Sequence, residues 1–179
     1  MFQPAWDEIT PLLNNSKLSN ATLDAWKDLK SGSMVHTKGE GNPRHYCSFF
    51  LPYDKGSGQI YLCNHIKAGD WIPPGGHIEP GETPSDAAVR EMEEELRVTI
   101  TKDMLEPYTL SVKPINRPES GCMTHFDVWY LVHMQVQQFH YLESEYHSAS
   151  WFTIPAALTK ITKNPDFAAI ISKIINRKS

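Results

Sequence analysis

The 179-residue sequence has little cysteine, no excess of positive charge and no long apolar segment. Its three cysteines, Cys47, Cys63 and Cys122, are an odd number without short metal-binding spacing, so we expect thiols in a reducing compartment and no disulfide framework. A formal net charge of −4 and the lack of a basic patch argue against nucleic acid as a partner. Because no apolar run reaches membrane-spanning length and the N-terminus lacks a secretory signal pattern, we expect a cytoplasmic protein that does not bind membranes.

The length and composition fit one folded domain with a short addition at its N-terminus. A chain of 179 residues can bury a sizeable core, and contents of 40% hydrophobic and 11% aromatic residues argue against disorder. Residues 1–33 carry two short amphipathic helical patterns and end in Ser-Gly-Ser, which breaks a helix. We therefore expect a helical N-terminal extension over residues 1–33 and the main domain over residues 34–179.

Strand patterns dominate the main domain, with one helix in its middle and one at its end. The first two strands flank a Lys-Gly-Ser-Gly sequence, which predicts a hairpin turn. The predicted strands cover residues 45–51, 60–66, 108–115 and 124–136, with a short strand at Trp151 and Phe152. Asn164 and Pro165 begin the last predicted helix, which carries a regular apolar stripe.

The longest predicted strand, residues 124–136, has two different faces. Its alternation places His125, Asp127 and Trp129 on one face and larger apolar residues on the other. The first face must be lined by polar groups or exposed to solvent. If it opens on a functional site, His125 could contact substrate, although a lone strand histidine more often has a structural role.

A clearly marked helix begins in the middle of the chain at Thr83. Thr83 can cap this helix, Pro84 suits a first position that needs no backbone donor, and Asp86 completes a capping box. Apolar residues at three- and four-residue intervals then form a stripe that can face a core, namely Ala88, Val89, Met92 and Leu96. The pattern predicts an amphipathic helix with a well-specified start.

Three of the four glutamates on this helix share one patch of its surface. Glu91, Glu94 and Glu95 are spaced i, i+3 and i+4, whereas Glu93 points away. Like charges at these spacings cost about 0.2–0.5 kcal/mol per pair, and no lysine in residues 83–98 offsets them. Hard cations such as Mg²⁺ take oxygen ligands of this kind. Taken alone, however, the triad is more often a solvated acidic face.

The residues around the triad resemble the signature of the Nudix hydrolase family. The signature spans residues 76–98 here, with Gly76, Glu82 and Arg90 at set intervals before the triad, and so many identities make chance agreement improbable. One position departs from the pattern, because Arg97 stands where the family usually has glycine. A left-handed helix cap disfavours a Cβ by about 1 kcal/mol, so the departure affects the cap and removes no metal ligand.

The resemblance implies a fold, a reaction and several residue roles. The implied fold is the Nudix α/β/α sandwich with a mixed central sheet. The implied reaction is hydrolysis of a diphosphate bond in a nucleoside diphosphate linked to another moiety, with Mg²⁺ or Mn²⁺ as cofactor. The implied metal ligands are the backbone carbonyl of Gly76 and the side chains of Glu91, Glu94 and Glu95. Glu82 and Arg90 match an ion pair that supports the loop and the helix.

Hydrolysis by activated water also needs a proton acceptor. In the family this base is either a helix glutamate, here Glu91 or Glu94, or an acidic residue on a later loop. Glu143 and Glu145 lie in such a loop, and of the two we favour Glu145. A role as solvated loop carboxylates is about equally typical of both.

Five further residues are candidates for contact with the substrate, namely Arg44, Tyr46, His77, Arg117 and His125. Arg44 and Tyr46 stand at the start of the first long strand, and His77 lies in the glycine loop. Arg117 belongs to a predicted loop over residues 116–121, where it could pair with phosphate. For each of these residues a plain structural or solvent-exposed role is the alternative.

The sequence leaves the substrate and one other class of function open. A catalytically inactive Nudix-fold module that senses a nucleotide or ADP-ribose is the alternative to a hydrolase, but such modules often lose metal glutamates and this chain keeps all three. A prenyl diphosphate isomerase would need a cysteine motif that is absent around Cys47 and Cys63. The expected partner is a small nucleoside diphosphate derivative, such as a nucleotide sugar, an ADP-ribose-like compound, a dinucleoside polyphosphate or a modified nucleoside triphosphate. A homodimer is compatible with the sequence.

Overall fold

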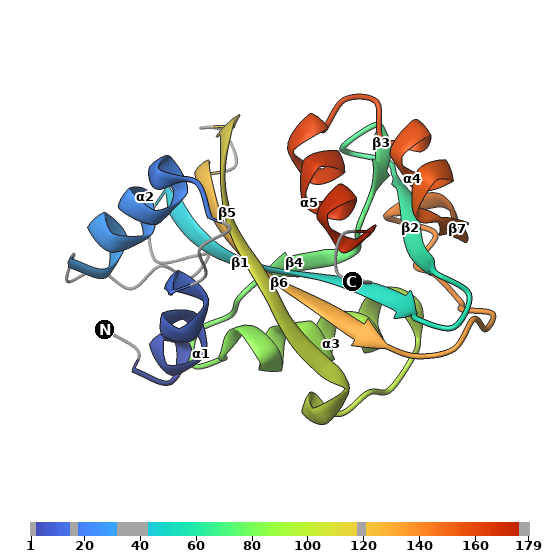
Figure 1. Ribbon diagram of the computed structural model, residues 1–179, viewed down its shortest axis with the longest axis horizontal. Coiled ribbons are helices and arrows are strands. Elements are labelled where there is room, and N and C mark those ends of the chain that lie inside the picture. The colour runs from blue at the N-terminus through green and yellow to red at the C-terminus, as the bar shows by residue number, and fades with distance from the viewer. Residues whose placement is uncertain (1–2, 15–17, 32–42, 118–120, 176–179) are drawn as a thin grey trace.

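A seven-stranded mixed sheet lies between two sets of helices in the computed structural model, which describes residues 3–14, 18–31, 43–117 and 121–175 (Figure 1). The elements in chain order are α1 (Gln3–Leu13), α2 (Asn20–Ser31), β1 (Arg44–Asp54), β2 (Gln59–His65), β3 (Asp70–Ile72), β4 (Gly75–His77), α3 (Pro84–Leu96), a 3₁₀ turn (Lys102–Met104), β5 (Leu105–Arg117), β6 (Cys122–His133), β7 (Tyr146–Thr153), α4 (Ile154–Lys160) and α5 (Pro165–Ile175). The predicted α/β fold with a mixed sheet and preceding N-terminal helices is confirmed. No helix in the described ranges is long and apolar enough to cross a bilayer.

The sheet is built around β1. Its strand order is β3-β2-β1-β6-β5, with β4 added to the first half of β1 and β7 added to β2. β1 and β6 run parallel, and the other pairs are antiparallel. In the first half of β1, Cys47 lies opposite His77 of β4 on one side and Asp127 of β6 on the other. Side chains of three neighbouring strands therefore meet at this point.

Local signals predicted the long elements better than the short ones. The hairpin turn between β1 and β2 forms as expected, with the Asp54 carboxylate accepting hydrogen bonds from Gly56 N at 2.8 Å and from Ser57. The sequence did not predict β3, β4 or α4, and it indicated only two of the eight residues of β7. β4 and β7 pair with strands far away in the sequence, so their positions depend on tertiary contacts, whereas the three-residue β3 pairs with the preceding strand β2.

The alternation along β6 separates two apolar cores on opposite faces of the sheet. Phe126, Val128 and Tyr130 pack with α1, α2 and α3, whereas Trp129 and Leu131 pack with α4 and α5. The predicted stripe of α5 is buried in the second core through Phe167, Ile170, Ile171 and Ile174. The alternation expected for this strand is therefore present, but the face that we expected to be polar or exposed is buried, with Trp129 in an apolar core, and β6 ends at His133.

The two N-terminal helices share the first core with the sheet. Trp26 of α2 is fully buried and stacks on Tyr46 of β1, with ring centroids 5.9 Å apart and planes 5° apart. Trp6 of α1 meets both rings edge-on. Ser19 caps α2 by accepting a hydrogen bond from Thr22 N at 3.1 Å. Residues before the main domain therefore complete the hydrophobic core on this face.

Asp70 joins β3 to the segment between α4 and α5. Its buried carboxylate accepts hydrogen bonds from the backbone and hydroxyl of Thr162, from Lys163 N, and from the backbone and side-chain amide of Asn164, at 2.8–3.1 Å. Burial raises the pKa of Asp70, but these hydrogen bonds outweigh burial and hold it below its usual value. The ionised form is therefore the one that holds this turn in place.

We expect Asp70→Asn to lower the free energy of unfolding by about 2–4 kcal/mol near pH 7, because an amide cannot accept all five hydrogen bonds. A depressed folded-state pKa contributes stability above the unfolded pKa, and that stability is lost as the pH falls through the folded value. The difference from wild type should therefore shrink in acid. Urea unfolding at a series of pH values from 7 into the acidic range measures this stability difference. The exposed Asp103→Asn serves as the matched control, and equal stability of the two variants would contradict the assignment.

Candidate active site

The local sequence fixes both ends of α3. The Thr83 hydroxyl accepts a hydrogen bond from Asp86 N at 3.2 Å, and the Asp86 carboxylate accepts one from Thr83 N at 3.1 Å, which completes the predicted capping box. Pro84 occupies the first turn as expected. At the other end, Arg97 adopts the left-handed conformation with φ 56° and ψ 39° that the family pattern reserves for glycine. The helix therefore ends as expected, despite the Cβ at its cap.

Glu8 of α1 supports the start of α3, and no sequence pattern indicated this role. Its carboxylate accepts hydrogen bonds from Ser85 N at 2.9 Å, from the Ser85 hydroxyl at 2.7 Å and from the Tyr130 hydroxyl at 2.8 Å. A carboxylate at the N-terminus of a helix also interacts favourably with the helix dipole. An N-terminal residue thus helps to position the helix that carries the glutamates.

The glycine loop packs directly on two of those glutamates. A Cβ at Gly76 would lie 2.1 Å from Oε1 of Glu91, so a side chain at this position would displace the carboxylate. Gly75 N donates a hydrogen bond to Oε2 of Glu95 at 3.0 Å. Close approach of β4 to α3 therefore requires glycine, and it holds the Gly76 backbone beside the acidic patch.

Arg90 binds several groups of the loop and the helix together. Its guanidinium contacts both oxygens of Glu82 at 2.7 and 3.0 Å, Glu91 at 2.8 Å and Glu94 at 3.2 Å. It also donates a hydrogen bond to the backbone carbonyl of His77 at 3.0 Å. The pairing of Glu82 with Arg90 implied by the sequence is therefore present as a half-buried ion pair.

The acidic patch has more negative charge than Arg90 compensates. The side chain of Glu91 is 13% exposed, Glu95 is buried, and Glu94 lies at the rim with 56% exposure. Burial raises the pKa of Glu91 against the opposing effect of Arg90, and Glu94 and Glu145 add to the rise. Burial raises the pKa of Glu95 well above its usual value, and the charges of Glu91 and Glu145 add to it. Crowded carboxylates beside a backbone carbonyl are a donor set that fits a hard divalent cation.

The structure brings Glu145 to the patch and leaves Glu143 outside it. Leu142 N donates a hydrogen bond to the backbone carbonyl of Glu95 at 2.8 Å, and Ile66 N donates one to the backbone carbonyl of Glu145 at 2.8 Å. These contacts attach the loop to α3 and to the end of β2. Glu145 thereby lines the same cavity as the helix glutamates, whereas Glu143 is exposed and does not line it.

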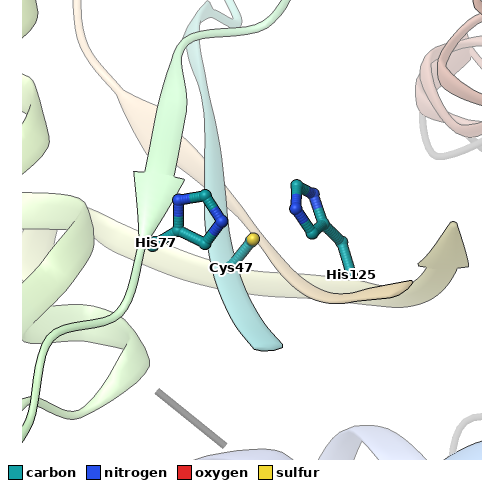
Figure 2. Close-up of side chains that lie close together, drawn as sticks. All are labelled: Cys47, His77 and His125. Atoms are coloured by element: carbon teal, nitrogen blue, oxygen red, sulfur yellow. The ribbon is translucent and has the colours of Figure 1, made fainter. Parts of the chain in front are cut away.

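A cavity of about 810 Å³ lies in front of the acidic patch. His77 and His125 line it together with Cys47 (Figure 2). The predicted substrate contacts Arg44 and Tyr46 do not line this cavity. Arg44 forms an ion pair with Asp28 at 3.1 Å and lies over the ring of Phe126, and Tyr46 is packed against the N-terminal helices. Arg117 is the last residue of β5, and its side chain lies outside the described part of the chain.

Sequence patterns did not indicate several cationic and aromatic residues that line the cavity. Lys113 of β5 and Lys163 before α5 line it, as does Phe167 of α5. The Lys113 ammonium lies 4.0 Å from the centre of the Phe167 ring, and burial lowers its pKa although nearby aspartates oppose the shift. These residues belong to segments far from the signature in the sequence. Lys163 and Phe167 reach the cavity because α5 packs on the sheet, and Lys113 reaches it because β5 pairs with β6.

Comparisons with known proteins agree with this architecture. The family model of the NUDIX domain matches residues 44–174. The RNA pyrophosphohydrolase of Rickettsia africae (strain ESF-5) is 48% identical over an alignment of 58 residues that covers 27% of this chain and 36% of that protein. Among solved structures, the E. coli dihydroneopterin triphosphate pyrophosphohydrolase has a TM-score of 0.64 at 20% identity and covers 80% of this chain and 99% of its own. A C. elegans Ap4A hydrolase has a TM-score of 0.55 at 20% identity, with 73% and 96% covered.

Proposed function

Because the chain belongs to the NUDIX domain family, we propose that it hydrolyses a diphosphate bond in a nucleoside diphosphate linked to another moiety. The observation that carries this proposal is the grouping of Glu91, Glu94, Glu95 and Glu145 around one cavity, with the backbone of Gly76 beside them. A protein that only binds nucleotides has no need for so much buried negative charge next to an anionic ligand. The acidic set therefore favours catalysis.

The residues that would hold Mg²⁺ or Mn²⁺ are Glu91, Glu94, Glu95 and the carbonyl of Gly76. When bound, such an ion supplies positive charge to the phosphates and makes a water molecule more acidic. The protein itself orients these donors through Arg90, which bonds to both Glu91 and Glu94. Glu82 keeps Arg90 in place. The charge of the whole protein cannot attract a diphosphate, so attraction must be local.

We assign the role of proton acceptor to Glu145. Glu91 and Glu94 bond to Arg90, and Glu95 accepts a hydrogen bond from Gly75 N, which ties all three to the loop and the helix. Glu145 is half-buried at the cavity wall, where its charge acts on Glu91 and Glu95. A carboxylate in this position can take a proton from attacking water.

The other side of the cavity suits the organic part of such a substrate. Lys113 and Lys163 offer positive charge for phosphate oxygens, and the apolar Phe49 and Phe167 offer surface for a base or another planar group. His77 and His125 line the same cavity, which supports a role for them in contacting a ligand there. The predicted phosphate contact of Arg117 stays a proposal, because its side chain is outside the described part of the chain.

A screen of diphosphate compounds tests the proposal. The panel should include nucleoside triphosphates, dinucleoside polyphosphates, ADP-ribose, nucleotide sugars, dihydroneopterin triphosphate and 5′-triphosphorylated RNA, each with Mg²⁺ or Mn²⁺ and with EDTA. We expect release of phosphate, diphosphate or nucleotide from at least one class only when the metal is present. Saturable nucleotide binding without turnover across the panel would instead identify a sensing module.

A further inference from the structure

A second group of metal-binding side chains lies in the same cavity, apart from the glutamates. The sulfur of Cys47 and one ring nitrogen each of His77 and His125 all lie within 4.8 Å of one another (Figure 2). Cys47 is buried, and the two histidines are half-buried. Within the described residues this is the cluster of histidine, cysteine and acidic side chains that is compact enough to hold a metal ion.

Strand pairing explains why these three residues meet. Cys47 stands directly opposite His77 in the antiparallel pair of β1 and β4. In the parallel pair of β1 and β6, Cys47 stands opposite Asp127, and His125 lies two residues earlier on β6, so it occupies the same face. The rings of His77 and His125 have centroids 4.9 Å apart. Three adjacent strands therefore point one ligand each toward a common point.

We propose that Cys47, His77 and His125 bind one divalent transition-metal ion of the zinc class. Thiolate and imidazole are the ligands that Zn²⁺ and Co²⁺ prefer, whereas Mg²⁺ prefers oxygen. The site thus differs in chemistry from the carboxylate site, and it does not depend on the proposed hydrolase activity. Tetrahedral coordination requires ligand atoms about 3.3–3.6 Å apart, so side-chain rotations that shift the ligand atoms by about 1 Å close the site.

Three protein ligands leave the fourth position of a tetrahedral ion open to the cavity. Sites of this composition retain water or a substrate atom at that position. Cys122 stands nearby, with its sulfur 3.6 Å from Nε2 of His77, but it is not part of the compact cluster. His45 also lies nearby, with its ring centroid 5.4 Å from that of His77, and its Nε2 contacts the Gly121 carbonyl at 2.8 Å. Cys122 and His45 therefore lie beside the site but are not among its three ligands.

Cobalt spectroscopy tests the proposal directly. Reduced, metal-free protein titrated with Co²⁺ should show one equivalent of a thiolate-to-cobalt charge-transfer band, together with the visible bands of four-coordinate Co²⁺. Zn²⁺ should remove these bands stoichiometrically, and excess Mg²⁺ should not. We expect Cys47→Ser to abolish the charge-transfer band, and His77→Ala and His125→Ala to weaken Co²⁺ binding by more than about tenfold.

Matched variants separate this site from other thiols and histidines. Cys63→Ser changes a buried cysteine of β2 outside the cluster, and His140→Ala changes an exposed histidine; both should keep the spectrum. Cys122→Ser should keep the thiolate-to-cobalt band, because its sulfur is not in the cluster, and should change only the affinity through its contact with His77. Circular dichroism confirms that each variant is folded, and His125→Asn provides a second ligand variant if His125→Ala does not fold.

Two results would overturn the assignment. One is a charge-transfer band that persists in folded Cys47→Ser. The other is displacement of Co²⁺ by Mg²⁺ at the same concentrations at which Zn²⁺ displaces it. Glu95→Gln should leave the cobalt spectrum unchanged, because the carboxylate belongs to the other site. The spectrum of this variant distinguishes failure of the zinc-class site from failure of the proposed hydrolase chemistry.

Discussion

Glu95→Gln should lower Mg²⁺-dependent turnover of the best substrate by more than about hundredfold, which corresponds to about 2.7 kcal/mol of transition-state stabilisation. The substitution keeps the size of the side chain and an oxygen that can accept the hydrogen bond from Gly75 N. It removes a buried negative charge that we assign to metal binding. The loss should therefore appear in turnover at saturating substrate and in a weaker dependence on Mg²⁺.

Stability should change in the opposite direction from activity. Burial and the charge of Glu91 raise the pKa of Glu95 above its usual value, so in the metal-free protein the folded state disfavours the ionised form. Such a group lowers stability as the pH rises from the unfolded toward the folded pKa, and glutamine removes this cost. Metal-free Glu95→Gln should therefore melt at or above the temperature of wild type near pH 7.

Glu93→Gln is the matched control on the same helix. Glu93 is exposed, and its carboxylate accepts a hydrogen bond from the Thr99 hydroxyl on the side away from the cavity. Turnover of this variant should stay within about threefold of wild type. If Glu95→Gln also stays within about threefold, the assigned metal chemistry is wrong. If both variants lose activity together, the effect belongs to the helix and not to the acidic patch.

The sequence predicted α3 well because the signals that define it are local. The capping box of Thr83 and Asp86 and the spacing of the glutamates act within a few residues, so they do not depend on tertiary contacts. The choice of Glu145 over Glu143 depends instead on hydrogen bonds from its loop to α3 and β2. No pattern within the loop distinguishes the two residues. Tertiary contacts decide which one faces the cavity.

Tertiary contacts also explain why some residues have surroundings that differ from those predicted from the sequence. Tyr46 follows Arg44 at the start of a strand and looked like a substrate contact, but Trp26, far earlier in the chain, stacks on its ring. The cysteines showed no short metal-binding spacing, and so the sequence favoured plain thiols. Cys47 nevertheless meets His77 and His125 through strand pairing, which spacing rules cannot detect.

Trp26→Ala should lower the free energy of unfolding by about 3–5 kcal/mol, a large part of the total stability of a domain of this size. Trp26 is fully buried, stacks on Tyr46 and meets Phe126 edge-on at 5.3 Å, and its indole N–H donates a hydrogen bond to the Ser111 carbonyl at 3.3 Å. Its removal leaves a cavity between α2 and the sheet. Denaturant unfolding followed by circular dichroism measures the loss.

The shape of that transition decides whether the N-terminal helices are an extension or a part of the core. If α2 is not part of the core of the main domain, Trp26→Ala should leave the main unfolding transition unchanged and add a separate transition at lower denaturant concentration. We expect a single transition shifted as a whole, because α1 and α2 contribute to the same apolar cluster as α3 and β6, and because Glu8 bonds to Ser85 at the start of α3. Trp71→Ala is the matched control, since Trp71 is only half-buried and packs on Phe152 at the other end of the sheet. A smaller loss there, with turnover retained, would show that the large effect at Trp26 comes from the core that positions α3.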